Sequence, residues 1–181
     1  MMLFRTLVFS LFCSFFLPLS GQDLPFIESF PDEIVAIEGN VAEGIIMEDL
    51  SWAWSGSNAC FTMTQSRKFR GLHVLYATEL QAYTEMEITL IPDDPEANFS
   101  LYAYQVGLHR TEAVPPNLVR CIRCEADYKW DRPYRGRTQD HRRIVKDLLS
   151  ARNPYRVVIG VVGPEGWEEA GYTLEIALLT R

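Results

Sequence analysis

Tyr155-Arg-Val-Val-Ile-Gly-Val-Val162 and Tyr172-Thr-Leu-Glu-Ile-Ala-Leu178 are the two stretches of sequence that decide the fold class. Nearly every side chain of the first stretch is apolar, which predicts a central strand covered on both faces. In the second stretch apolar residues alternate with Thr173 and Glu175, which predicts a strand with one buried face. Residues 163–171 between them contain three glycines. We therefore expect the two strands to pair as a hairpin with a long tip.

Short runs of β-branched and aromatic residues continue upstream, separated by Pro, Asp, Asn and Gly. Residues 140–149 also carry apolar side chains at helical spacing, and we favour a strand over a helix there. About eight to ten such strands predict an all-β domain built as an antiparallel β-sandwich or a barrel. The other candidate strands are Glu33–Glu38, Gly44–Glu48, Cys60–Thr64, Leu72–Thr78, Met86–Ile91, Phe99–Val106, Val119–Tyr128 and Arg142–Leu149.

The composition fits one packed domain. The chain has 181 residues, of which 48% are hydrophobic and 23% charged, with a formal net charge of -7. This length leaves no room for a multi-domain enzyme, and the hydrophobic fraction excludes a disordered chain. The acidic balance lacks the basic surface that phosphate binding requires, so no nucleic-acid partner is expected.

The N-terminus predicts export. Arg5 precedes an apolar run from Leu7 to Leu19, which has the length of a signal-peptide core and is shorter than a membrane-spanning helix. Small residues follow, so we expect cleavage near Ser20–Gln22, with a retained anchor helix as the alternative. This gives a signal peptide over residues 1–21, a single domain over residues 22–181 and no transmembrane segment. The expected location is the periplasm, the cell surface or the exterior.

The C-terminal segments 153–163 and 171–176 resemble the end of a bacterial pre-peptidase C-terminal (PPC) domain. In that family a buried strand is followed by a Gly-rich loop and an alternating strand. The resemblance extends upstream and covers roughly residues 49–179, preceded by N-terminal strands in residues 22–48. The upstream segments that are similar to the family's earlier strands are Phe69–Gly71, Met86–Pro92 and Asn98–Tyr104.

The resemblance implies a jelly-roll-like β-sandwich of the kind attached to secreted proteases and other exported proteins. The segment Gly107–Asn117 and the cysteines depart from the family pattern. Because no peptidase sequence precedes the domain, we expect a stand-alone exported relative.

None of the usual catalytic signatures is present in the sequence: it has no Gly-x-Ser-x-Gly, no His-Glu-x-x-His and no phosphate-binding loop. The histidines His73, His109 and His141 are scattered singly. We expect His73 to be a hydrogen-bonded structural residue rather than a ligand. The sequence therefore predicts a protein that is not an enzyme and has no catalytic residues.

Three cysteines follow the predicted signal peptide: Cys60, Cys121 and Cys124. On a regular strand residues 121 and 124 are about 10 Å apart and point to opposite faces, so they should not form a disulfide with each other. Cys124 shares the more apolar face with Ile122, which predicts a Cys60–Cys124 disulfide, with Cys121 as the alternative partner. A zinc site that adds His73 to the cysteines is less expected in an exported chain.

Two further groups are candidate binding sites. Asp93, Asp94, Glu96 and Asn98 collect oxygen ligands in one turn and predict a candidate calcium site, the alternative being acids that simply face water. No other cofactor is expected. Aromatic residues are candidates for a ligand-facing platform, the alternative being tyrosines buried between sheets. The platform candidates are Tyr102, Tyr104, Trp130 and Tyr134.

The sequence thus favours an exported, non-enzymatic β-sandwich that serves as an accessory or binding module of the bacterial envelope or exterior. Its partner is expected to be a protein or a carbohydrate at the cell surface. The alternatives are a small secreted hydrolase built on a β-sandwich and a structural envelope protein without a ligand.

Overall fold

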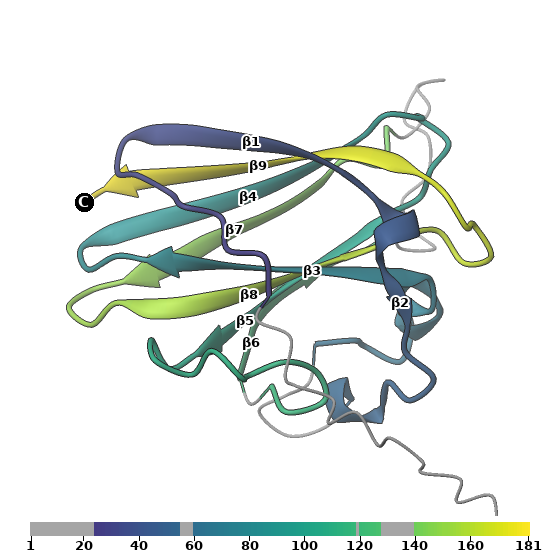
Figure 1. Cartoon of the computed structure of the whole chain (residues 1–181), viewed down its shortest axis with the longest axis horizontal. Coiled ribbons are helices and arrows are strands. Elements are labelled where there is room, and N and C mark those ends of the chain that lie inside the picture. Colours follow the sequence, from purple (N-terminus) through teal and green to yellow (C-terminus); the bar gives the residue numbers. More distant parts are fainter. Residues whose placement is uncertain (1–23, 55–59, 119, 128–139) are drawn as a thin grey trace, which may run out of the picture.

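The computed structural model describes residues 24–54, 60–118, 120–127 and 140–181. Two antiparallel sheets pack face to face and form a β-sandwich (Figure 1), which confirms the predicted all-β class. Its strands are β1 (Glu33–Asn40), β2 (Ile45–Ile46), β3 (Leu72–Leu80), β4 (Thr84–Pro92), β5 (Ser100–Val106), β6 (Arg120–Glu125), β7 (Arg143–Ser150), β8 (Tyr155–Val162) and β9 (Gly171–Thr180). Short 3-10 turns accompany them: η1 (Val41–Glu43), η2 (Ser51–Ala53) and η4 (Ser66–Phe69).

The strand order explains the composition of residues 155–162 and 172–178. One sheet has the order β1-β9-β4-β7 and the other the order β2-β3-β8-β5-β6. Strand β8 is the middle strand of its sheet and all of its residues are buried, as its apolar composition predicts. In β9 the buried residues alternate with partly exposed ones, as predicted for a strand with one buried face.

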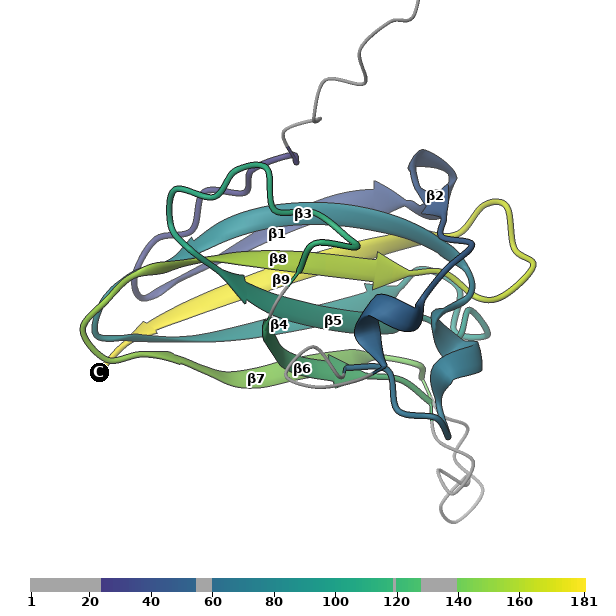
Figure 2. The same cartoon turned by 90° about the horizontal axis from the view of Figure 1, so that it is seen from below.

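The predicted hairpin between these two strands is wrong. Strand β8 belongs to the five-stranded sheet and β9 to the four-stranded sheet, so residues 163–171 cross from one sheet to the other. In Figure 1 the strands β1, β9, β4 and β7 lie above β3, β8, β5 and β6, and Figure 2 shows the loops that join the strands at their ends. An alternating pattern tells which face of a strand is buried but not which strand pairs with it, and a long loop suits either connection.

Most of the other strands lie where the sequence places them, including β7, which settles the ambiguous segment 140–149 as a strand. The strand predicted at Cys60–Thr64 is wrong. The backbone N–H groups of Cys60 and Phe61 both donate to the Ala53 carbonyl, and turns follow. On a strand Phe61 and Met63 would share one face. Phe61 is buried whereas Met63 is 94% exposed, so these residues do not form a strand with one buried face.

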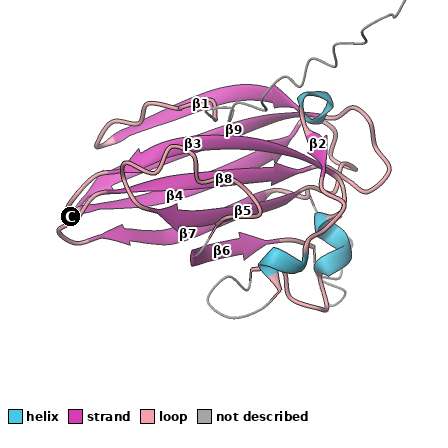
Figure 3. Cartoon of the chain, turned by 60° about the horizontal axis from the view of Figure 1, so that its bottom comes forward, coloured by secondary structure: helices cyan, strands magenta, loops and turns pink. Residues whose placement is uncertain are grey.

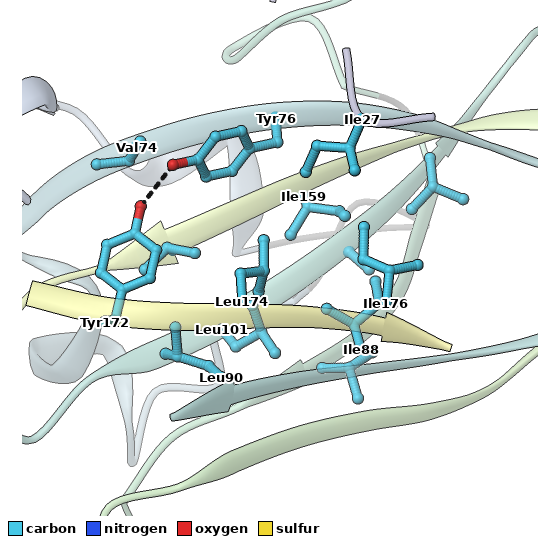
Figure 4. Packing of buried hydrophobic residues seen from close by; sticks show 14 of the residues in the cluster. Ile27, Val74, Tyr76, Ile88, Leu90, Leu101, Ile159, Tyr172, Leu174 and Ile176 are labelled. Atoms are coloured by element: carbon cyan, nitrogen blue, oxygen red, sulfur yellow. Dashed lines mark hydrogen bonds between the residues drawn. The ribbon is translucent and has the colours of Figure 1, made fainter. Parts of the chain in front are cut away.

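The main core lies between the two sheets (Figure 4). Side chains of β4 and β9 meet those of β3, β5 and β8 there, and the Tyr76 and Tyr172 hydroxyls hydrogen-bond across the layer at 2.9 Å. Figure 4 labels Ile27, Val74, Ile88, Leu90, Leu101, Ile159, Leu174 and Ile176 around this pair.

A second apolar cluster covers the outer face of the five-stranded sheet. Tyr102, Tyr104 and Val158 project from that face and are fully buried. The segment that contains η2 and η4 packs over them, and Phe61 and Phe69 stack with ring centroids 3.9 Å apart. Figure 3 shows the short helical turns at the ends of the strands. Cover on both faces explains why β8 contains no exposed position.

None of the described segments forms a helix long and apolar enough to cross a membrane.

Candidate functional site

The aromatic platform expected at Tyr102 and Tyr104 is not exposed. Both tyrosines point to the outer face of the five-stranded sheet, as the sequence predicted, but the covering segments bury them completely. Burial raises the pKa of both phenols well above their usual range. These tyrosines are core residues, which is the alternative stated for them. Trp130 and Tyr134 lie outside the described residues.

Two of the four oxygen-bearing side chains of the candidate calcium site, Asp94 and Asn98, hydrogen-bond to different parts of the chain. The Asp94 carboxylate accepts a hydrogen bond from the Glu96 backbone N–H at 2.8 Å. The Asn98 amide donates to Asp127 and accepts from Arg143, each at close distance. Within residues 24–54, 60–118, 120–127 and 140–181, no three His, Cys, Asp or Glu residues are grouped so as to hold a metal ion. Asn98 therefore serves a structural ion network rather than the turn.

The structure pairs Cys60 with Cys121, with Cα atoms 5.6 Å apart, and leaves Cys124 as a free thiol. The preferred Cys60–Cys124 pairing is therefore wrong, and the stated alternative is found. The reason is a β-bulge between β5 and β6: Cys124 is opposite Tyr102 and Cys121 is opposite Tyr104. The bulge puts both cysteines on one face, because cross-strand partners share a face.

His73 is a buried, hydrogen-bonded residue of the outer-face cluster, as predicted. Its Nε2–H donates to the Phe69 carbonyl at 2.9 Å, so Nδ1 accepts from the Tyr102 hydroxyl at 3.1 Å. Burial lowers the pKa of His73 to about 4. His109 is exposed between β5 and β6, and His141 lies beside Arg143. Among the described residues, no hydrogen bond joins a histidine to a carboxylate.

A pocket of about 420 Å³ opens at the edge of the five-stranded sheet. It lies along β3, where the N-terminal segment and β2 both reach that strand (Figure 1). Pockets with apolar walls and a few convergent polar groups are the usual binding sites of proteins. The residues that line it are Leu24, Pro25, Glu43, Ile45, His73, Val74, Leu75 and Tyr76.

Two short pairings flank this pocket on the free edge of β3. At one end, β2 pairs with the start of β3 through Ile45 opposite His73. At the other end, Phe26 forms a parallel bridge with Ala77: the Ala77 N–H donates to the Pro25 carbonyl at 2.9 Å, and the Ile27 N–H donates to the Ala77 carbonyl at 2.8 Å. Leu75 lies midway between these two pairings.

The backbone groups of Leu75 point into the gap. In an antiparallel ladder alternate residues turn both N–H and C=O to the same edge. Since Ala77 turns both groups toward the N-terminal segment, Leu75 turns its own to that edge and not toward β8. In the part of the chain that the structure describes, no hydrogen bond reaches either group from this side.

The local sequence explains why the gap stays open. Continued parallel pairing would place the N–H of residue 25 at the Leu75 carbonyl, but Pro25 has no N–H. Continued pairing of β2 would place Glu43 opposite Leu75, but Glu43 belongs to the turn η1. The Asn40 side chain begins that turn by accepting from the Ala42 N–H at 3.0 Å. The proline and the capped turn thus leave the Leu75 carbonyl without a donor from either described segment.

Glu43 gives the pocket its charge. Burial raises the pKa of Tyr76, and the nearby Glu43 carboxylate adds to this effect, so the hydroxyl stays neutral. His73 is neutral at neutral pH because of its lowered pKa. The described residues place no ion-pair partner on Glu43. The pocket therefore combines apolar walls, an open peptide group and one negative charge.

No pattern in the sequence predicted this site. Pro25, Glu43 and Leu75 belong to none of the motifs from which a site was expected. Two local signals were available, namely the proline at residue 25, shortly after the predicted signal peptide, and Asn40, which caps the turn η1. Neither signal reveals which strand edge the two segments approach, because that depends on tertiary pairing.

Comparisons with known proteins give little further information. No family model matches the chain, and no curated protein matches its sequence. Among solved structures, the chain is similar to PliG from Aeromonas hydrophila, a periplasmic lysozyme inhibitor of g-type lysozyme, with 9% sequence identity and a TM-score of 0.38. The match covers 86% of this chain and 97% of that one. A likeness at this level supports no argument about function, and the PPC resemblance stays a prediction.

Proposed function

We propose that this chain is an exported, non-enzymatic binding module of the bacterial envelope or exterior, and that it binds its partner at the pocket on the free edge of β3. The observation that carries the proposal is the interruption of edge pairing at Leu75, where an apolar pocket meets a backbone N–H and C=O that have no partner among the described residues. The N–H and C=O of a free strand edge are a common place for a peptide partner to pair.

Two features support binding over catalysis at this pocket. Both ring nitrogens of His73 are engaged and its pKa is lowered to about 4, so it is a poor proton acceptor at neutral pH. The Tyr76 hydroxyl is paired with Tyr172 and its pKa is raised, so it is a poor nucleophile. The pocket is thus lined by groups that position a ligand and not by groups that react with it.

Export is supported by the apolar run at Leu7–Leu19 and by the Cys60–Cys121 disulfide, because disulfides persist in oxidising compartments. A protein partner and a carbohydrate partner are both compatible with this location. The pocket favours a protein, because its unpaired N–H and C=O match a peptide group.

The experiment is affinity capture from an envelope extract of the native host with three immobilised proteins. They are the wild type, Ile45→Trp, which fills the pocket, and Ile34→Trp, which adds the same side chain on β1 in the other sheet. Ile45 and Ile34 are 59% and 70% exposed, so both variants should fold. We expect a partner that the wild type and Ile34→Trp retain and that Ile45→Trp loses. Equal retention by all three proteins would contradict the proposal.

A further inference from the structure

We propose that the gap at Leu75 accepts one residue of an extended peptide segment from a partner protein, with a positively charged group of that segment beside Glu43. This inference rests on the proposed function and specifies the chemistry of the ligand.

The first support is the backbone of β3. The Leu75 N–H and C=O face the edge on which Ala77 pairs with residues 25 and 27, and they have no partner among the described residues. A single residue of an extended peptide offers one C=O and one N–H with the spacing that these two groups require. Addition of a peptide to a free sheet edge is a common mode of recognition.

The second support is the size of the gap. The open edge lies between His73 and Ala77, the two residues that pair on this side, which are about 13 Å apart at the rise of a strand. Pairing of β2 closes one end and the Phe26 bridge closes the other. A β3 edge from a second copy cannot pair here, because both copies would bring the same flanking segments into the contact. The peptide segment that enters the gap must therefore be narrow, such as a chain terminus or the tip of a loop of the partner protein.

The third support is the side-chain chemistry. Leu24, Pro25 and Ile45 offer apolar contacts on both sides of Leu75. Glu43 is exposed at the rim, has no ion-pair partner within the described ranges, and lies close enough to affect the titration of Tyr76. Opposite charge on the ligand is therefore favoured, by an amount that falls as salt concentration rises.

The test is a nuclear magnetic resonance titration of the ¹⁵N-labelled exported chain with acetyl-Val-Lys-Val-amide. The control peptide carries a methyl group on the lysine backbone nitrogen, which removes the donor to the Leu75 carbonyl and keeps the side chains. We expect the Leu75 amide resonance to move with the first peptide. The methylated peptide should bind with an affinity that is lower by a factor of about five or more. We expect Glu43→Gln to weaken binding of the first peptide and to remove its salt dependence.

A substitution outside β3 tests whether Pro25 keeps the β3 edge at Leu75 free. Pro25→Ala restores an N–H at the position that the parallel register places opposite the Leu75 carbonyl. This intramolecular donor competes with the ligand, so we expect weaker peptide binding by Pro25→Ala. Pro31→Ala, an exposed proline beyond the bridge, is the matched control and should bind as the wild type does.

Three outcomes overturn the inference. Equal binding of the two peptides excludes backbone pairing. Shifts of Val74 and Tyr76 with the uncharged fragment isobutyramide, without any response of Leu75 to the peptide, would overturn the peptide inference and leave the binding pocket intact. A dimer in sedimentation, with the Leu75 amide already protected from exchange, would assign the gap to a second copy of the chain.

Discussion

His73 shows how one buried residue links the cover of the five-stranded sheet to its strands. It lies on β3, donates to the Phe69 carbonyl next to η4, and accepts from Tyr102 on β5. The bond from Tyr102 requires the neutral imidazole, because in the protonated ring Nδ1 carries a hydrogen and cannot accept, whereas the bond to Phe69 fits either form. Burial is the main cause of the lowered pKa.

The first prediction concerns stability against pH. In the unfolded chain His73 takes up a proton near pH 6.5, whereas in the folded chain it does so only near pH 4. Its folded pKa is lowered, so the free energy of unfolding should fall as the pH drops from about 6.5 to about 4, by about 3 kcal/mol. Urea unfolding at pH 7, 5.5 and 4 measures this loss.

The control for that measurement is the exposed His109. His109→Gln should keep the same loss of stability between pH 6.5 and 4. His73→Gln should be less stable than the wild type at pH 7 but should lose less stability over this range. An identical pH dependence of wild type and His73→Gln would contradict the assignment to His73.

The second prediction concerns the cysteines. Cys124→Ser should keep the Cys60–Cys121 disulfide and change the free energy of unfolding little. Cys121→Ser opens a loop of 61 residues and should lower the free energy of unfolding by about 4 kcal/mol. Non-reducing peptide mapping and urea unfolding of the two variants test this, and a dominant Cys60–Cys124 peptide in the wild type would contradict the bulge in β6.

At the scale of elements, alternation in the sequence predicted the strands well but not their partners. The alternation in β9 correctly predicted which of its side chains are buried, because that depends on the residues of the strand itself. The partner of β9 depends on residues far away in the chain, so the hairpin with β8 was wrong. The bulge at Ile122 in β6 was missed for a related reason: one extra residue changes which side chains share a face, and no local signal marks it.

The third prediction tests the packing of β8 beneath its cover. Gly160 is opposite Tyr102, and a Cβ at this position would overlap the Tyr102 ring. Gly160→Ala should therefore lower the free energy of unfolding by about 2 kcal/mol through overpacking. Gly107→Ala is the control, because its Cβ would meet only the flexible Arg110 side chain. Thermal unfolding compares the two, and an unchanged Tm for Gly160→Ala would contradict a tightly packed outer face.

At the scale of the whole molecule, the sequence predicted the fold class but not the site. Composition and alternation are properties of the chain, and they require two buried layers of strands. The pocket arises where β2 and residues 25–27 approach the same edge of β3. That meeting depends on how the whole sandwich is assembled. The platform expected at Tyr102 and Tyr104 failed because alternation could not show that an additional layer covers the sheet.

The proposed role follows from this assembly. The sandwich supplies a rigid edge strand, and the two flanking segments limit that edge to one open position. We expect such an arrangement to select a narrow peptide segment and to oppose edge-to-edge pairing with a second copy. The export signal stays a prediction, because residues 1–23 lie outside the described residues.

Hydrogen exchange of the Leu75 amide tests the central claim most directly. In the free protein we expect Leu75 to exchange much faster than Val74 and Tyr76, whose N–H groups face β8. Saturation with acetyl-Val-Lys-Val-amide should slow the exchange of Leu75 and leave its two neighbours unchanged. Equal protection of Leu75, Val74 and Tyr76 in the free protein, or no added protection of Leu75 with the peptide, would contradict the account.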